Sequence, residues 1–262
     1  MGSKAKDNPI SILVTAGGTI EDIDTVRGIS NHASGRLGSL IADKFSQSGA
    51  NVTFLCGENS LRPKRKPHEL IIIRNTDQLA SSLEKLLRKT SFDCVIHSMA
   101  VSDFTPHTVM GVDDLAGCIE KELSGEDLCR DKIAQAVCAA ISKSAQQPSE
   151  KKISSKSSHL MLILKQTSKA IGMIKALQPN TLLVGFKLLS GTDKPTLMAA
   201  GQNLMEQNGC DLVLANDINE ISGENHKAIL LDGGGIICWA DTKPEIAEMI
   251  FNQVTERLRR AK

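Results

Sequence analysis

The segment from Ser11 to Gly38 constrains the fold more strongly than any other part of the chain. It begins with an apolar run, SILVTA, passes through Gly17 and Gly18 into a loop rich in Asp, Arg and Asn, and reaches a Ser34-Gly35 pair ahead of a helical pattern. A strand, a glycine turn and a helix start leave backbone N–H groups and the positive end of a helix dipole beside one another. The sequence therefore predicts an anion-binding site, with phosphate as the expected ligand.

Apolar runs and helical patterns alternate along the rest of the chain. Strands are expected at 51–56, 69–75, 93–101, 160–165, 181–188 and 211–217. Helices are expected at 37–48, after a cap at Thr76 or Asp77, at 168–177 and at 195–207. Nearly continuous apolar strands separated by helices are typical of parallel sheets covered on both faces. The last part differs, because 227–240 has the pattern of a hairpin around three glycines and 244–260 that of an amphipathic helix. The predicted fold class is α/β: a Rossmann-like, doubly wound, mostly parallel sheet with a C-terminal hairpin and helix.

The alternation stops in one place, between Thr105 and His159. We expect a single domain over 10–262 with an insertion at about 106–158, preceded by a disordered tail at 1–9. Residues 131–143 of the insertion have helical spacing, whereas 144–158 is rich in Ser and Lys and is expected to be a mobile loop. A long polar loop inside an α/β domain is often functional, so we interpret it as a lid.

Composition excludes several classes of protein. The formal net charge of +1 over 262 residues argues against a nucleic-acid-binding protein, and no apolar stretch approaches the roughly 20 residues that span a bilayer. We therefore expect a cytoplasmic protein with no membrane partner. Seven cysteines without a CxxC pair suit buried, reduced thiols, and six histidines without an HExxH spacing do not suggest a protein-held metal.

A dinucleotide-binding fold is the first alternative for the glycine turn. About fifteen residues separate Gly17-Gly18 from the Ser34-to-Gly38 turn, so the compact GxGxxG of such folds is missing. Glu58, after the second predicted strand, is weak evidence for a ribose-binding acid. An NAD(P)-dependent oxidoreductase and a nucleotide-binding regulator that has lost its chemistry stay open as alternatives at this point.

Further polar segments follow the predicted strands at their carboxyl ends, where doubly wound sheets bind ligands. These are Ala100 to Phe104, Gly185 to Lys187 and Asn216-Asp217. Together with the Gly17 loop they predict one crevice. Each also has a structural interpretation, since Asp103 suits a turn cap, Phe186 a core position and Asn216-Asp217 the start of a loop.

Six motifs occur in one order along the chain. They are TAGGT at 15–19, R-x-I-S-N-H-x-S-G at 27–35, AVSDF at 100–104, KIS at 152–154, VGFK at 184–187 and LANDI at 214–218. In this set the chain resembles the phosphopantothenoylcysteine synthetase family in its stand-alone bacterial form, over nearly the whole length from Ile12.

The resemblance implies a ligase of coenzyme A biosynthesis that joins 4'-phosphopantothenate to L-cysteine. The carboxylate attacks the α-phosphorus of a nucleoside triphosphate, and the amine of cysteine captures the acyl nucleotide. Bacterial members use CTP, so a 4'-phosphopantothenoyl-CMP intermediate is expected. Mg²⁺ is expected to bridge the triphosphate oxygens, held by the nucleotide more than by the protein. The resemblance also implies a homodimer.

The resemblance assigns roles to individual residues. Lys152 and Asn31 match the catalytic lysine and asparagine: Lys152 offsets charge on the α-phosphate, and Asn31 orients the acyl carbonyl and donates to its oxyanion. The nucleotide- and substrate-binding positions are Gly17, Gly18, Thr19, Arg27, Ser34, Gly35, Ala100, Asp103, Phe104, Phe186, Lys187, Asn216 and Asp217. This chain has Leu204 and Asn208 where the fused bacterial pattern has a lysine pair, which makes Lys187 a candidate replacement.

Overall fold

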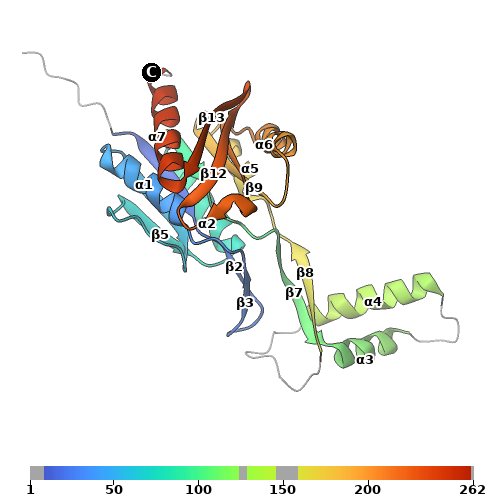
Figure 1. The fold of residues 1–262 in the computed structure, drawn as a ribbon. Coiled ribbons are helices and arrows are strands. Elements are labelled where there is room, and N and C mark those ends of the chain that lie inside the picture. Colours follow the sequence, from blue (N-terminus) through green and yellow to red (C-terminus); the bar gives the residue numbers. More distant parts are fainter. Residues whose placement is uncertain (1–8, 124–128, 146–158, 261–262) are drawn as a thin grey trace, which may run out of the picture. The chain divides into compact units, whose positions relative to one another are not determined.

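The computed structural model describes residues 9–123, 129–145 and 159–260 (Figure 1). The chain divides into two compact units. Unit 1 comprises Met1–Thr19, Asn31–Val101 and Lys169–Lys262, and unit 2 comprises Ile20–Ser30 and Ser102–Ser168. The disordered tail predicted at 1–9 lies outside the described residues except for Pro9.

A mostly parallel sheet forms the centre of unit 1. Among the described residues its strand order is β11-β12-β10-β9-β6-β1-β4-β5, and β13 pairs with β12. The strands are β1 (Ser11–Ala16), β4 (Asn51–Gly57), β5 (Glu69–Ile73), β6 (Cys94–His97), β9 (Leu182–Leu189), β10 (Leu212–Asp217), β11 (Ile221–Ser222), β12 (Asn225–Asp232) and β13 (Gly235–Thr242). The pairs from β5 to β10 are parallel, and β12 is antiparallel to β10, β11 and β13. This confirms the predicted Rossmann-like class. The order reverses at β1, which lies between β4 and β6.

Helices cover both faces of this sheet, as the apolar strands predict. Alternate residues of β1 point to opposite faces, so that Ile12 and Val14 join one core cluster and Leu13 the other. The first cluster lies under α1 (Arg36–Gln47) and α7 (Lys243–Arg260). The second lies under α2 (Thr76–Lys89), α5 (Ala170–Leu177) and α6 (Lys194–Asn208). The expected helices are confirmed to within a few residues of their predicted bounds.

The start of α2 differs from the prediction in its capping residue. The side chain of Asn75 accepts a hydrogen bond from the backbone N–H of Gln78 at 2.9 Å, so Asn75 is the N-cap and not Thr76 or Asp77. An asparagine oxygen can satisfy one of the N–H groups that have no partner in the first helical turn. Thr76 lies inside the helix and is buried.

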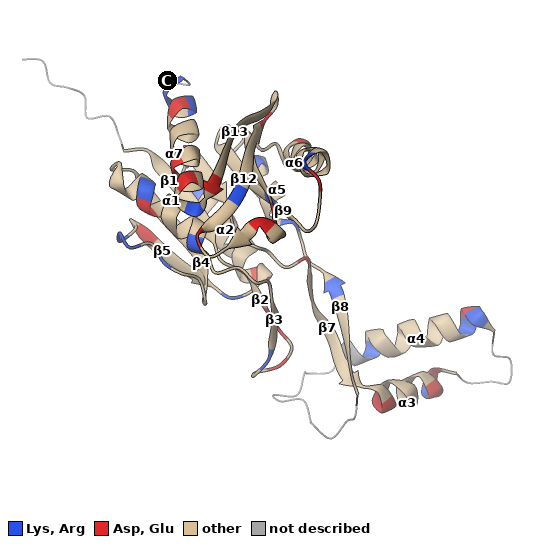
Figure 2. Cartoon of the chain, viewed as in Figure 1, with Lys and Arg blue, Asp and Glu red and all other residues tan. Residues whose placement is uncertain are grey.

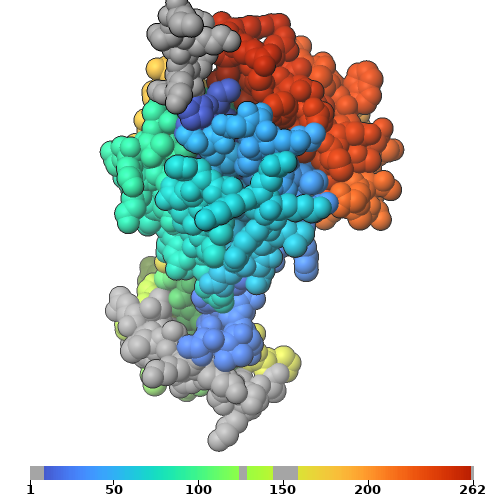
Figure 3. Space-filling model, turned by 90° about the vertical axis from the view of Figure 1, so that its left-hand side faces the viewer, coloured from blue at the N-terminus to red at the C-terminus, as the bar shows by residue number. Residues whose placement is uncertain are grey.

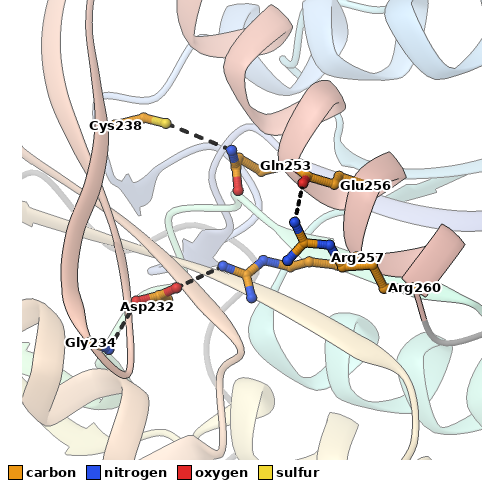
Figure 4. Close-up of polar contacts among 7 residues, drawn as sticks. All are labelled: Asp232, Gly234, Cys238, Gln253, Glu256, Arg257 and Arg260. Carbon is orange, nitrogen blue, oxygen red and sulfur yellow. Dashed lines mark hydrogen bonds and ion pairs between the residues drawn. The ribbon is translucent and has the colours of Figure 1, made fainter.

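Polar contacts join the C-terminal hairpin to the helix that follows it (Figure 4). The carboxylate of Asp232 accepts hydrogen bonds from Gly234 N at 2.9 Å and from Arg257 Nη2 at 2.8 Å, and the side chain of Gln253 reaches Cys238 Sγ at 3.8 Å. The hydrogen bond from Arg257 is the main cause that lowers the pKa of Asp232. Figure 2 shows charges of both signs along α7, while its buried residues, such as Ile246 and Ile250, lie in the first core cluster.

Unit 2 contains elements that the sequence did not predict. A short hairpin joins β2 (Ile20–Asp22) to β3 (Gly28–Ser30), and β7 (Phe104–Gly111) pairs with β8 (Leu160–Gln166) in an antiparallel two-stranded sheet. The strand expected at 160–165 in the parallel sheet is therefore wrong in its partner, because β8 pairs with β7 instead.

Helices α3 (Val112–Glu122) and α4 (Arg130–Ala145) contact each other, and α4 confirms the helix expected at 131–143. The insertion predicted at 106–158 falls within this unit.

Cysteine burial agrees with the apolar runs that contain them. Cys56, Cys94 and Cys210 are buried, Cys238 is half-buried, and none of the seven cysteines is paired in a disulfide. Over the described ranges, none of the helices has the length and apolar character that crossing a membrane requires.

Candidate functional site

The glycine turn after β1 is packed too closely for any side chain. Gly17 has a φ of +79°, and a Cβ added there would lie 2.7 Å from the Cβ of Ser60. The carbonyl oxygen of Gly18 approaches Gly57 at the end of β4, where an added Cβ would lie 2.2 Å from it. Glycine tolerates both the positive φ and the close approach. The turn therefore presents bare backbone at the carboxyl edge of the sheet.

The backbone of Ala100 connects this turn with Asn31. Ala100 N donates to Gly17 O at 2.8 Å, and Ala100 O accepts from Thr19 N at 3.3 Å. The same carbonyl accepts from the side-chain amide of Asn31, also at 3.3 Å. The structure thus brings together five predicted site residues, namely Gly17, Gly18, Thr19, Asn31 and Ala100.

The start of α1 adds a second set of backbone donors. Gly35 is the N-cap, in a left-handed conformation with φ 73°, and no side chain caps the helix at that residue. The first turn of α1 contains no acidic residue. Ser34 precedes the cap, and its hydroxyl oxygen accepts a hydrogen bond from Arg36 N at 3.4 Å. A Cβ at Gly35 would lie 3.1 Å from Gly17 N, so the two glycine segments are neighbours. Such a helix start favours an anion.

The predicted residues on β9 and β10 lie further along the same edge. Phe186 and Lys187 pair with Leu214 and Ala215 in the parallel register. Phe186 is half-buried and packs against the first core cluster, which supports its structural interpretation. Lys187 is half-exposed.

Asn216 and Asp217 are both buried at the end of β10. Asp217 accepts hydrogen bonds from the backbone N–H groups of Thr192 at 2.7 Å, Asn219 at 2.8 Å and Gly191 at 3.2 Å. Of these, the bond from Thr192 contributes most to lowering the pKa of Asp217. The bond from Asn219 makes Asp217 the cap of the turn that follows β10, as the loop-start interpretation predicts, and the other two bonds hold the loop after β9.

Three predicted site residues belong to unit 2. Arg27 donates to Asp24 through Nε at 3.1 Å and Nη2 at 2.7 Å, within the β2–β3 hairpin. Asp103 is exposed, and its backbone carbonyl accepts from Thr167 N at 3.0 Å. Phe104 is 47% exposed at the start of β7.

The positions still to be located are Lys152 and the two positions of the missing lysine pair, Leu204 and Asn208. Lys152 lies outside the described residues, as does the 146–158 part of the expected lid. Leu204, at one position of the missing lysine pair, packs against the second core cluster, and Asn208 donates to Leu204 O at 3.0 Å within α6. Leu204 therefore serves the packing of α6, whereas Asn208 bonds to the backbone of its own helix.

Sequence reasoning missed two buried contacts at the site. Thr15 Oγ1 and His97 Nδ1 lie 2.9 Å apart across β1 and β6, and burial lowers the pKa of His97 to about 4. Ser60 packs against both glycine segments. His97 and Ser60 carry no local signal, because each is defined by partners far away in the sequence.

Two further observations bear on what the site can hold. Among the described residues, no group of three His, Cys, Asp or Glu side chains is arranged to bind a metal ion. A cavity of about 360 Å³ opens at the opposite, amino-terminal edge of the sheet, lined by Ile10, Asp93 and Thr181 among others. It contains none of the predicted site residues.

Curated relatives resemble the chain over nearly its whole length. The coenzyme A biosynthesis bifunctional protein CoaBC of Thermococcus kodakarensis is 28% identical over 248 residues, which cover 94% of this chain and 51% of that protein. The protein of the same name from Methanocaldococcus jannaschii is 23% identical over 257 residues, covering 97% and 52%. The chain thus spans about half the length of these two relatives.

Solved structures share the fold. The crystal structure of the DNA/pantothenate metabolism flavoprotein from Streptococcus pneumoniae has a TM-score of 0.78 at 30% identity and covers 95% of this chain and 99% of that one. A Cab2 variant in complex with phosphopantothenate-cysteine has a TM-score of 0.61 at 19% identity, covering 96% and 87%.

The family match agrees with the resemblance drawn from the six motifs. It extends over residues 8–112 and 124–258, which include Asn31, both glycine segments and the strand ends described above. The chain belongs to the family described as the DNA/pantothenate metabolism flavoprotein C-terminal domain.

Proposed function

We propose that the chain is a phosphopantothenate–cysteine ligase. The observation that carries the proposal is the position of Asn31, whose amide is held on Ala100 O beside the Gly17-Gly18 turn. The family match, and the CoaBC relatives whose name refers to coenzyme A biosynthesis, support the proposal. The Cab2 complex contains phosphopantothenate-cysteine, the product of the proposed reaction.

In the first step the carboxylate oxygen of 4'-phosphopantothenate attacks the α-phosphorus of the nucleotide. A P–O bond forms, the bond to the β-phosphate breaks, and pyrophosphate leaves with the electron pair. Because two anions meet, the step needs donors fixed where negative charge gathers. The glycine turn and the start of α1 are proposed to supply backbone N–H groups, and Lys152 is proposed to supply the cation.

In the second step the amine nitrogen of cysteine attacks the acyl carbon. A C–N bond forms, the nucleoside monophosphate leaves, and the amine loses a proton. Asn31 is proposed to donate to the acyl oxygen, which gains negative charge as the tetrahedral intermediate forms. The hydrogen bond to Ala100 O fixes the orientation of the Asn31 amide beside the glycine turn.

CTP and Mg²⁺ are proposed as the nucleotide and its metal ion. The bare glycine backbone beside the helix start fits phosphate groups, and phosphate oxygens bind Mg²⁺ with little help from protein ligands. Mg²⁺ would supply charge neutralisation on the triphosphate. Lys187, half-exposed at the end of β9, is proposed to replace the absent lysine pair in contacting the nucleotide.

A homodimer is proposed from the resemblance to the family. The exposed hydrophobic side chains of the late segment include Trp239 on β13, which is 77% exposed and is the only tryptophan in the sequence. Light scattering after size exclusion would measure the mass directly. A mass of one chain at micromolar concentration would contradict the proposal.

One experiment tests the reaction class and the base preference together. The protein is incubated with 4'-phosphopantothenate, cysteine and one of four nucleoside triphosphates, and pyrophosphate and the monophosphate are measured. Release of both with CTP, dependent on phosphopantothenate, is expected. Equal rates with ATP would contradict the CTP preference, and no release with any nucleotide would contradict the ligase.

A further inference from the structure

The turn after β4, residues 57–61, lies where three parts of unit 1 meet. Gly57 ends β4 and packs against Gly18, as described above. Leu61 N then donates to Ser34 O at 2.8 Å, which attaches the loop before α1 to this turn. The face that contains α1 and the β4–β5 segment is turned to the viewer in Figure 3.

Ser60 is the contact residue of this turn. Its Oγ lies 1.9 Å from the position that a Cβ at Gly35 would take, and its Cβ lies 2.7 Å from the corresponding position at Gly17. Ser60 is 8% exposed, and its own N–H donates to Gly57 O at 3.0 Å. Its hydroxyl donates to Leu61 O at 3.1 Å. A small, hydrogen-bonded side chain thus fills the space between the two glycine segments.

The loop from Asn31 to Gly35 is consequently held at both ends. At one end the side-chain amide of Asn31 donates a hydrogen bond to Ala100 O, and at the other end Ser34 O accepts one from Leu61 N. A displacement of the turn would move the second anchor and the start of α1 together. Since a misplacement of about 1 Å can cost on the order of 100-fold in rate, a contact that holds this loop can affect the reaction rate.

We propose that Ser60 is a positioning residue, which sets the Asn31–Gly35 loop and the start of α1 against the Gly17-Gly18 turn. This inference rests on the proposed ligase activity. Ser60 acts through Asn31 and the backbone donors, and a side chain of a different shape at position 60 misplaces them.

The test compares three variants at this position by steady-state kinetics and by hydrogen exchange. Ser60→Val pushes methyl groups against Gly17 and Gly35 and is expected to lower kcat about 10- to 100-fold. Ser60→Ala keeps the Cβ contact and is expected to stay within about 3-fold of wild type, below the cost of a misplaced group. Ser60→Gly leaves a gap and serves as the second perturbing variant if Ser60→Val does not fold. The exposed neighbour Asn59, changed to Ala, is the matched control.

A double-mutant cycle separates positioning from a general loss of structure. In an Asn31→Ala background, Ser60→Val is expected to lower kcat by a clearly smaller factor than in wild type, because one of the groups it misplaces is already absent. Equal losses in both backgrounds would overturn the proposal. So would a loss in Ser60→Ala as large as that in Ser60→Val.

Hydrogen exchange tests the same contact without any assay of the reaction. Faster amide exchange in a peptide covering 31–38 is expected in Ser60→Val and Ser60→Gly but not in Ser60→Ala or Asn59→Ala. Unchanged exchange in both perturbing variants would overturn the role of Ser60. If wild type releases no pyrophosphate, the ligase proposal fails, and the exchange result still decides whether Ser60 holds the loop.

Discussion

Asn31 gives the sharpest prediction at the scale of single residues. Asn31→Asp places a carboxylate where the amide donates to Ala100 O, and this charge repels the oxyanion of the second step. The second step is expected to slow by about 100- to 1,000-fold, so that the acyl nucleotide accumulates on the enzyme. Rapid quenching and chromatography would measure it. Asn180→Asp, an exposed position before β9, is the control, and normal turnover of cysteine by Asn31→Asp would contradict the role.

The role proposed for Lys152 can be tested by measuring pyrophosphate release in the first step of the reaction. Lys152→Gln removes the cation proposed to offset charge on the α-phosphate, and pyrophosphate release is expected to fall by at least about 100-fold. Thermal unfolding is the check that the variant folds, and Lys151→Gln is the matched control. Pyrophosphate release near the wild-type rate would contradict the role proposed for Lys152.

The contact between the C-terminal hairpin and α7 makes a prediction at the scale of elements. Arg257 and Asp232 form an ion pair at 2.8 Å, and both side chains are partly buried. Arg257→Gln breaks this pair and is expected to lower the free energy of unfolding by about 0.5–1 kcal/mol. Urea denaturation at pH 7 would measure the loss. Arg259→Gln, exposed on the same helical turn, is expected to change little. The bonded carboxyl of Asp232 has a lowered pKa, so the difference between Arg257→Gln and wild type should shrink below pH 3.8.

Most elements of unit 1 could be predicted from the sequence because burial imposes a local pattern. The strand around Ile12 to Ala16 is apolar except for Thr15 and is buried on both faces, and α7 has the spacing of an amphipathic helix. The 160–165 strand shows the limit of such patterns. An apolar run predicts a strand but not its partner, and here the partner is β7, whose first residue, Phe104, pairs with Gln166.

At the scale of the whole molecule, buried histidines predict how stability depends on pH. Burial lowers the pKa of His97 from 6.5 to about 4, and burial together with the Lys243 charge lowers that of His226 likewise. Between these values the unfolded chain binds more protons than the folded one, so stability falls as pH drops from about 6.5 to about 4. His97 contributes roughly 3 kcal/mol at most over this range.

Chemical denaturation from pH 4 to 7.5 would measure this dependence. His97→Gln is expected to flatten the slope even if it lowers stability at every pH, whereas the exposed His107→Gln is expected to leave the slope unchanged. A slope in His97→Gln equal to that of wild type would show that another group binds the protons.

The sequence by itself determined the class of sheet, the glycine turn before α1 and the family, because each depends on residues close together in the chain or on an ordered set of motifs. Only the tertiary structure decided that Ser60 fills the space between Gly17 and Gly35 and that Asn31 donates to Ala100 O. It also decided that His97 pairs with Thr15, 82 residues earlier. These contacts depend on which strands become neighbours and in what register, and no local pattern of burial or turn residues specifies that choice.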